Sequence, residues 1–406
     1  MDAWTGVVIT KSMRGHKTGR RDGGNIILGV VSTFPPREDG IATFTRDLLD
    51  AVCGARSGIM ARIAAITDPG SYYAYPRQVR WEIDQGDPER YAEAGRALSR
   101  SAADVISLQH EFGLYGVWGD PLQDYTPALL ATLDKPIVTT LHTVLSQPRR
   151  DIREAVRRLC AHSVATVVMA RVGAKILVED YDVDSARLVT IPHGVPEVRP
   201  VDRQRLKRVL RLDGYTVICT FGLLSRGKGI ENVIRALPAL LERHPDVLYL
   251  VMGETHPQVR KQEGESYRKE LLSLARELGV SRQVRFLNQY LTQNHLIRYL
   301  QATDIYVTPY RDRNQITSGT LSYALGCGRA IVSTAYVYAA EALAEGRGLL
   351  AEFDRPESIA RCITLYLDDP AFREKTEARA LAYGREMAWP RVGERYADLF
   401  RRVAQA

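Results

Sequence analysis

Residues 303–336 read TDIYVTPYRDRNQITSGTLSYALGCGRAIVSTAY, and this stretch decides the fold class. The β-branched run 305–307 predicts a buried parallel strand, which Pro309 ends. Small residues then begin a helix over 317–327, and another buried strand is expected at 330–334. The order strand, helix, strand predicts an α/β protein.

The start of this helix is a candidate anion site. The free backbone N–H groups at a helix N-terminus attract negative charge. Gly319 would let the chain approach a phosphate closely, and Ser318 and Thr320 add hydroxyls. A nucleotide-linked substrate fits this layout, and so does a strand–loop–helix unit that binds nothing.

The length of 406 residues predicts two domains, because a single core rarely grows beyond about 250–300 residues. Strands and helices alternate twice along the chain, which is typical of parallel sheets. We expect strands at 26–32, 105–108, 137–141, 164–169, 188–191, 216–221, 247–251 and 284–287, and helices from Thr43, over 230–243 and over 267–278. The prediction is therefore an α/β fold of two Rossmann-like domains, 26–197 and 198–380, facing a central crevice.

Composition indicates a reducing compartment. The cysteines are odd in number and scattered, which predicts free thiols and argues against a structural zinc site; they are Cys53, Cys160, Cys219, Cys327 and Cys362. No apolar run approaches the roughly 20 residues of a membrane span, and 1–25 lacks the apolar core of a signal peptide. We expect a cytoplasmic protein with a flexible, basic leader at 1–25.

The net charge of +7 is mild for this length and does not indicate nucleic acid. The densest basic stretch is predicted to be an amphipathic helix whose outer face carries Arg149, Arg150, Arg153, Arg157 and Arg158. Such a face is either solvated or binds lipid headgroups or another polyanion. Peripheral contact with the inner membrane face therefore stays open.

Loops at the carboxyl ends of the strands are where ligands of such sheets bind. The loop 35–42 reads PPREDGIA and is not GxGxxG, which disfavours a nicotinamide cofactor. The loop 222–229 reads GLLSRGKG and nearly matches the phosphate loop of NTPases, but Gly229 replaces the hydroxyl residue that would hold magnesium. Lys228 and Arg226 still offer fixed positive charge to a phosphate.

Asp180, Asp182 and Asp184 offer carboxylates at alternate positions, so they could hold a divalent metal. Neither a glycine nor a later glutamate completes a calcium loop, which favours a solvated turn instead. We therefore expect no metal site and no cofactor.

Several segments, in this order and spacing, carry a family resemblance from about Ile26 to the C-terminus. They are PPREDGIATFTRDLL, TLHTV, IPHGVP, GLLSRGKGIENVIRALPALL, YLVMGE, VRFLNQYLTQNHLIRYLQATDIYVTPY, GTLSYALGCGRAIVST and AWPRVGERYADLF. The chain resembles GT-B glycosyltransferases of glycosyltransferase family 4. That group transfers sugars from nucleotide-sugar donors, usually with retention and without a metal. The segment at 381–406 resembles the family's C-terminal helix, which crosses back to the first domain.

The resemblance implies roles for individual residues. Lys228 would contact the donor diphosphate, His142 would lie near the transferred sugar, and the loop holding Leu287 would border the base. The implied donor-binding residues are Gly40, Gly222, Lys228, Leu287, Gln315, Ser318, Gly319, Thr320 and Tyr323.

The chain also departs from the family pattern. Counting back from Gly328, the two glutamates of the family's E-x7-E motif fall on Gln315 and Tyr323. Both can still hydrogen-bond a sugar or ribose. The arginine that often precedes the lysine falls on Leu223, and Arg226 could compensate.

These departures leave the stereochemistry open. In a retaining reaction a leaving phosphate oxygen can take the acceptor proton. An inverting reaction needs a base, for which His110, Glu111 and His142 are candidates. His193 is expected to shape the hinge; Tyr115 and Trp118 would stack on an acceptor sugar or pack their loop.

The predicted function is transfer of a hexose, from GDP-mannose first and UDP-glucose next, to a hydroxyl of a carbohydrate or glycolipid acceptor. The alternatives are a nucleotide-sugar epimerase, a sugar phosphorylase, and a non-catalytic nucleotide-sugar-binding protein suggested by the missing glutamates. Turnover of a donor with an acceptor separates them.

Overall fold

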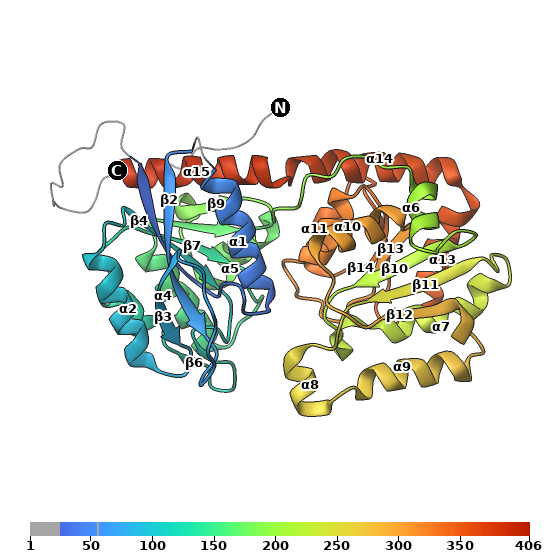
Figure 1. Cartoon of the computed structure of the whole chain (residues 1–406), viewed down its shortest axis with the longest axis horizontal. Helices are drawn as coiled ribbons and strands as arrows, with labels where there is room; N and C mark the ends of the chain where they lie inside the picture. The colour runs from blue at the N-terminus through green and yellow to red at the C-terminus, as the bar shows by residue number, and fades with distance from the viewer. Residues whose placement is uncertain (1–24, 55–56) are drawn as a thin grey trace. The chain divides into compact units, whose positions relative to one another are not determined.

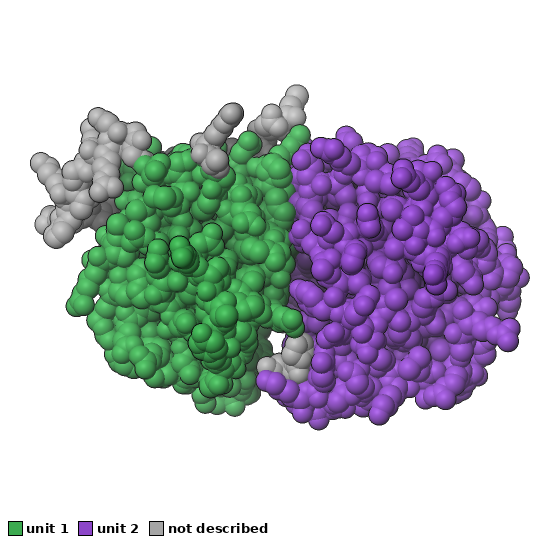
Figure 2. Space-filling model, in the orientation of Figure 1, with its two compact units in different colours: residues 1–194, 389–406 green, residues 195–388 purple. Residues whose placement is uncertain are grey.

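The computed structural model describes residues 25–54 and 57–406, so nearly all of the predicted leader lies outside the described residues. The chain forms two compact units (Figure 2). Unit 1 is the chain up to Gly194 together with Trp389–Ala406, and unit 2 is Val195–Ala388. The first boundary falls at 194/195 instead of the expected 197/198. The second falls at 388/389 instead of 380/381, because helix α14 (Pro370–Glu386) runs on within unit 2.

Unit 1 contains a parallel sheet with strand order β3-β2-β1-β4-β7-β8-β9 (Figure 1). Its strands are β1 (Ile26–Ser32), β2 (Ile59–Thr67), β3 (Val79–Asp84), β4 (Val105–His110), β7 (Ile137–Leu141), β8 (Ala165–Val168) and β9 (Leu188–Thr190), and a short antiparallel ribbon joins β5 (Gly116–Val117) to β6 (Gln123–Asp124). Its helices are α1 (Gly40–Val52), α2 (Pro88–Arg100), α3 (Thr126–Leu130), α4 (Arg150–His162), α5 (Arg171–Tyr181) and α15 (Trp389–Gln405), with a 3₁₀ turn η1 (Ser185–Arg187).

Unit 2 has a second parallel sheet, with strand order β12-β11-β10-β13-β14-β15. Its strands are β10 (Thr216–Phe221), β11 (Val247–Met252), β12 (Val284–Leu287), β13 (Ile305–Thr308), β14 (Ala330–Thr334) and β15 (Leu349–Ala351). Its helical elements are α6 (Arg203–Val209), η2 (Arg226–Lys228), α7 (Ile230–Leu241), α8 (Pro257–Glu263), α9 (Ser266–Glu277), η3 (Ser281–Gln283), α10 (Gln293–Ala302), α11 (Gly319–Gly326), α12 (Val337–Ala342), α13 (Pro356–Asp368) and α14.

The predicted α/β class and the two parallel sheets are confirmed. The strands that are buried on both faces, such as β10 and β13, were predicted because they read as continuous apolar runs. Strands β2 and β3 were missed. Their burial is interrupted by exposed residues, since β3 is the edge of the sheet and β2 lies beside it.

The C-terminal helix α15 is part of the core of unit 1. Its buried face carries Trp389, Tyr396 and Phe400, which pack with the apolar residues of α1 and β1. Gly393 lets α15 approach α1 closely, because a Cβ there would lie 2.7 Å from the Cβ of Ala51. The last 18 residues of the sequence are therefore structurally part of the first domain.

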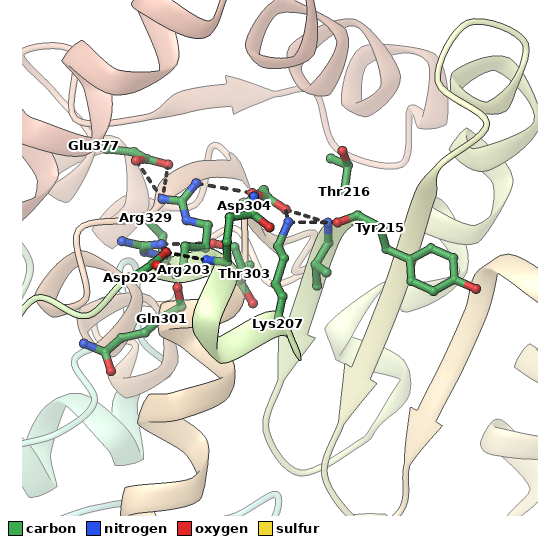
Figure 3. A network of polar contacts seen from close by, with 12 residues as sticks. Asp202, Arg203, Lys207, Tyr215, Thr216, Gln301, Thr303, Asp304, Arg329 and Glu377 are labelled. Carbon is green, nitrogen blue, oxygen red and sulfur yellow. Dashed lines mark hydrogen bonds and ion pairs between the residues drawn. The ribbon is translucent and has the colours of Figure 1, made fainter. Parts of the chain in front are cut away.

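Buried charges hold the first helix of unit 2 against its sheet (Figure 3). Lys207 of α6 donates to the Asp304 carboxylate and to the carbonyl of Tyr215 (2.8 Å). Asp304 also accepts from the backbone N–H of Val217 (2.7 Å) and from Arg203 (3.2 Å). Since every charge in the group has a partner, the ionic cluster can be buried without an orphaned ion.

Candidate active site

The N-terminus of α11 lies at the carboxyl end of β13, as the sequence predicts for an anion site. Ser318 is the N-cap, and its hydroxyl accepts from the N–H of Leu321 (3.3 Å). The Thr320 hydroxyl lies 3.1 Å from that of Ser318. The first N–H groups of a helix have no intrahelical acceptor, so Gly319 and Thr320 present donors here together with two hydroxyls.

Lys228 ends the short turn η2 that follows β10. Its ammonium nitrogen lies 3.9 Å from the centroid of the Tyr310 ring. Within residues 25–54 and 57–406, no carboxylate lies within ion-pair distance of Lys228. Its positive charge is therefore not neutralised by a neighbouring side chain and can serve an anionic ligand.

Gly229 explains why the NTPase-like loop lacks its hydroxyl residue. Its backbone is left-handed, with φ of 61°, and a Cβ at this position would collide with the carbonyl oxygen of Pro309. Serine or threonine cannot be accommodated in this conformation without strain. The glycine is needed for the close passage of two loops, which argues against an NTPase phosphate loop at this position.

Gly222 brings the loop after β10 against α11. It has φ of 130°, and a Cβ there would lie 3.3 Å from the methyl carbon of Thr320. Gly253 at the end of β11 was not predicted as a site residue, although it lies in the quoted segment YLVMGE. A Cβ on Gly253 would collide with the carbonyl oxygen of Gly222. The absence of a side chain at both glycines thus lets the ends of β10 and β11 and the first turn of α11 pack closely together.

Arg226 does not offer the free charge predicted for it. Its guanidinium forms a two-pronged hydrogen bond with Glu270 (2.7 and 2.6 Å), and its Nε lies 3.3 Å from Glu263. Hydrogen bonding to Glu270 raises the pKa of Arg226 further. Because two carboxylates on one side of the loop balance this charge, Arg226 is a weaker candidate for phosphate binding than Lys228.

The positions of the replaced glutamates make local hydrogen bonds. The Gln315 amide donates to the carbonyl of Thr317 (2.7 Å). The Tyr323 hydroxyl accepts from Gln293 (2.9 Å), the first residue of α10. The backbone of Leu287 accepts from the N–H of Gly253 (3.0 Å), which fixes the end of β12.

Two of the predicted histidines meet in unit 1. His110 ends β4, His142 follows β7, and the backbone N–H of His142 donates to the carbonyl of His110 (3.0 Å). The ring of His142 hydrogen-bonds Gln109 (3.0 Å) and meets Phe44 edge-on. Burial lowers the pKa of His110 to about 4 and that of His142 to about 3. Both rings are therefore neutral and weakly basic near pH 7.

Glu111 is the best base among the three candidates. Its carboxylate accepts from the Thr143 hydroxyl (2.8 Å) and from the N–H of Phe112 (2.8 Å). Burial nevertheless raises the pKa of Glu111 to about 7. A base is most effective when its pKa lies near the working pH, which favours Glu111 over either histidine.

The neighbouring aromatic residues differ in their surroundings. Tyr115 is buried, stacks on His110, and donates to the carbonyls of Val31 (3.1 Å) and Gln109 (3.0 Å), so it packs the loop. Trp118 is half exposed and packs against Phe112, which leaves a ring face available to an acceptor.

His193 is half-buried in unit 1, where its ring hydrogen-bonds the carbonyl of Gly194 (2.7 Å) at the end of that unit. Burial lowers the pKa of His193 to about 4. His193 therefore lies where the chain leaves unit 1, and its predicted role in shaping the hinge stays a prediction.

Gly40 begins α1 in open space, since no atom lies within 4 Å of where its Cβ would be. The preceding residue, Asp39, caps the helix by accepting from the N–H of Ala42 (2.7 Å). Arg37 holds the same loop through Asp39 (3.1 Å), Asp68 (3.1 Å) and the carbonyl of Ile66 (3.0 Å). The sequence did not reveal this role of Arg37, because two of its three partners, Ile66 and Asp68, are far away along the chain.

The carboxylates of the three aspartates are held by separate partners. Asp182 pairs with Arg153 and Arg157, the Asp180 carboxylate accepts from the N–H of Gln147, and Asp184 caps η1. Across the described residues no group of three or more histidine, cysteine, aspartate or glutamate side chains could hold a metal ion.

Arg149, which caps α4, and the four arginines within α4 are likewise engaged. All five lie within 3.3 Å of a carboxylate; their partners are Asp120, Asp124, Asp151, Glu154 and Asp182. This pairing favours the solvated face over a polyanion site. None of the helices in the described part of the chain is both long and apolar enough to cross a bilayer.

Comparison with known proteins agrees with this geometry. Residues 202–386 match the family described as "Glycosyl transferases group 1", and residues 66–199 match "Glycosyltransferase Family 4". A D-inositol 3-phosphate glycosyltransferase of Corynebacterium aurimucosum is 27% identical over 285 residues, covering 66% of this chain and 66% of that protein. The match to this relative thus spans slightly less than two thirds of its length.

A further relative matches almost from end to end. The GDP-mannose-dependent monoacylated alpha-(1-6)-phosphatidylinositol monomannoside mannosyltransferase of Corynebacterium glutamicum is 26% identical, covering 92% of this chain and 97% of that protein.

Solved structures share the fold. Anabaena Alr3699/HepE, in complex with UDP, superposes with a TM-score of 0.72 at 16% identity, covering 93% of this chain and 100% of that one. The sucrose-phosphate synthase of Thermosynechococcus elongatus gives a TM-score of 0.74 at 18% identity, covering 93% and 98%. The two family matches lie in order along most of the chain, and both units have the Rossmann-like sheets of these GT-B neighbours. The chain therefore belongs to the group 1 glycosyltransferases of glycosyltransferase family 4.

Proposed function

We propose that this protein transfers a hexose from a nucleotide sugar, with GDP-mannose first and UDP-glucose next, to a hydroxyl of a carbohydrate or glycolipid acceptor. The observation that carries the proposal is the anion site of unit 2. There Lys228, which has no carboxylate partner among the described residues, and the hydroxyl-bearing N-terminus of α11 lie at neighbouring strand ends. The mannosyltransferase name of the relative that matches end to end supports the choice of donor and of a lipid-linked acceptor.

In the proposed reaction the bond from the sugar C1 to the diphosphate oxygen breaks, and a bond from C1 to the acceptor oxygen forms. Negative charge grows on the departing diphosphate, where Lys228 and the N–H groups of α11 would stabilise it. The reaction is proposed to proceed with retention and without a metal. The acceptor proton then passes to the leaving phosphate oxygen, and Glu111 orients the acceptor hydroxyl.

We place the protein in the cytoplasm, in peripheral contact with the membrane that would carry a glycolipid acceptor. The lipid named for the Corynebacterium glutamicum relative supports this placement. Binding to vesicles that contain the glycolipid, compared with vesicles that lack it, tests the contact separately from catalysis.

The decisive experiment measures transfer from GDP-mannose and UDP-glucose to phosphatidylinositol mannosides, with and without EDTA. Formation of a glycosylated lipid in EDTA is the expected result, and NMR of the product's anomeric proton reads the stereochemistry. Donor hydrolysis without transfer, or activity that returns only with magnesium or manganese, would contradict the proposal. Binding of the nucleotide sugar without turnover on any acceptor would favour the non-catalytic alternative.

A further inference from the structure

One tyrosine connects the two groups of unit 2 that would hold a diphosphate. Tyr310 follows β13 and is 1% exposed. One face of its ring lies under the Lys228 ammonium, 3.9 Å from ring centroid to nitrogen. Its hydroxyl lies 2.6 Å from the hydroxyl of Thr320, in the first turn of α11. A single side chain therefore touches both the lysine loop and the helix N-terminus.

Tyr310 is itself held firmly. Its ring stacks on Tyr336, with centroids 5.5 Å apart and planes at 16°. Its carbonyl accepts from the Thr334 hydroxyl (2.6 Å) at the end of β14. Because Thr334 of β14 holds its backbone and Tyr336, just after β14, holds its ring, Tyr310 has a fixed position from which it can orient Lys228 and Thr320.

The nature of the contact matters for an anion site. A carboxylate partner would neutralise a lysine, as Glu270 does for Arg226. An aromatic face attracts the ammonium through its quadrupole and leaves the net charge in place. Lys228 is thereby restrained to one position while its charge stays available, which lowers the ordering cost of binding a phosphate.

We propose that Tyr310 is a positioning residue for the donor diphosphate, acting through Lys228 by its ring and through Thr320 by its hydroxyl. The inference rests on the proposed function, since it assumes that a nucleoside diphosphate binds at this site. The inference gives a role to Tyr310, which is not among the donor-binding residues implied by the family resemblance.

The test uses the full-length protein, with GDP and UDP as probes in isothermal titration and with donor turnover as a second readout. Tyr310→Phe keeps the ring and removes the hydroxyl, so the dissociation constant of the nucleoside diphosphate should rise about two- to tenfold. Tyr338→Phe is the matched control. It removes an equally buried hydroxyl contact in α11, to Ser322 (2.8 Å), away from Lys228, and should leave the affinity unchanged.

Tyr310→Met fills a similar volume without a ring face, and it should lower kcat at least tenfold more than Tyr310→Phe does. The same change in a Lys228→Ala background should lower kcat less than twofold further, because the two residues act as one unit. Equal losses of kcat in both backgrounds would show a merely structural role and overturn the ring contribution.

The hydroxyl contribution does not depend on the folding of Tyr310→Met. An unchanged affinity in Tyr310→Phe, or an equal loss in Tyr338→Phe, overturns it. Failure of wild type to bind GDP or UDP would instead remove the proposed function on which the inference rests.

Discussion

Lys228 and Arg226 lie two residues apart in one loop, yet only Lys228 keeps an unbalanced charge. We expect Lys228→Ala to lower kcat by about 10² to 10³, the usual cost of removing one donor from developing negative charge. Arg226→Ala should lower kcat less than about fivefold, because its exposed ion pairs contribute little. Donor turnover with matched circular dichroism spectra measures both. Equal losses in the two variants would contradict the separation of their roles.

Glu111 should give the reaction its pH dependence. Burial raises its pKa to about 7, and the ionised carboxylate accepts a stronger hydrogen bond from an acceptor hydroxyl than the neutral acid does. We expect kcat/KM for the acceptor to rise as the pH increases through about 7, and this rise should be absent in Glu111→Gln. A pH profile from 5.5 to 8.5, taken at saturating donor, measures it. An unchanged rise in Glu111→Gln would exclude the residue from the acceptor side.

The raised pKa of Glu111 also predicts that its contribution to stability changes with pH in the direction opposite to that of kcat/KM. Its pKa in the folded state lies above the ordinary value of 4.5, so between about pH 4.5 and 7 the folded protein binds the proton more tightly than the unfolded chain does. Its contribution to the free energy of unfolding therefore falls as the pH rises through this window. Denaturant titrations of wild type and Glu111→Gln should show a difference that changes with pH in this direction.

Residues beside strand ends were the ones that the sequence could identify. Ser318, Thr320 and Lys228 follow readable strands, so topology alone placed them at one edge of the sheet. Tyr310, Gln293 and Gly253 were missed as site residues because their roles depend on contacts with distant segments. The ion pairing of Arg226 was not predicted for the same reason, since Glu270 lies 44 residues away.

At the scale of single elements, the cap of α1 links stability to the site. Asp39 caps the helix that begins at Gly40, and it also pairs with Arg37. Asp39→Ala should lower the free energy of unfolding by about 0.5–2 kcal/mol and should also reduce turnover, because the loop at Gly40 loses its anchor. Asp87→Ala removes the cap of α2 and should affect stability alone. Denaturant titration and kcat, measured on both variants, separate the effect of each cap on stability from its effect on turnover. Full turnover in Asp39→Ala would contradict a role for this loop.

Elements were predictable where a local pattern decides their structure. The periodic apolar face of α4 predicts only a helix, and the apolar run of β10 predicts only a buried strand. The paired strands β2 and β3 and the helix α6 depend on partners far along the chain: α6 is short and is held by the buried pair Lys207–Asp304. Elements that are stabilised by such tertiary contacts carry little local pattern in their own sequence, so they were not predicted.

For the molecule as a whole, the last helix should determine the stability of the first unit. Phe400 of α15 is fully buried in the core of unit 1, so Phe400→Ala should cost about 3–5 kcal/mol there. Leu237→Ala, in the core of unit 2, is the matched control. Hydrogen exchange read by mass spectrometry should show faster exchange in β1 and α1 for the first variant and in β10 and β11 for the second. Equal changes in both units would contradict their independence.

The chain enters unit 2 at Val195 and leaves it at Ala388, and these two residues form a β-bridge. On the other side of the junction, Gly194 touches the indole of Trp389 so closely that a side chain at 194 would collide with it. Topologically, unit 2 lies between two segments of unit 1 whose ends, Gly194 and Trp389, are neighbours. Engineering can use this arrangement. Residues 195–388 can be exchanged as one cassette for the same segment of a relative with another donor, and Gly194 rejoined to Trp389 would make unit 1 continuous.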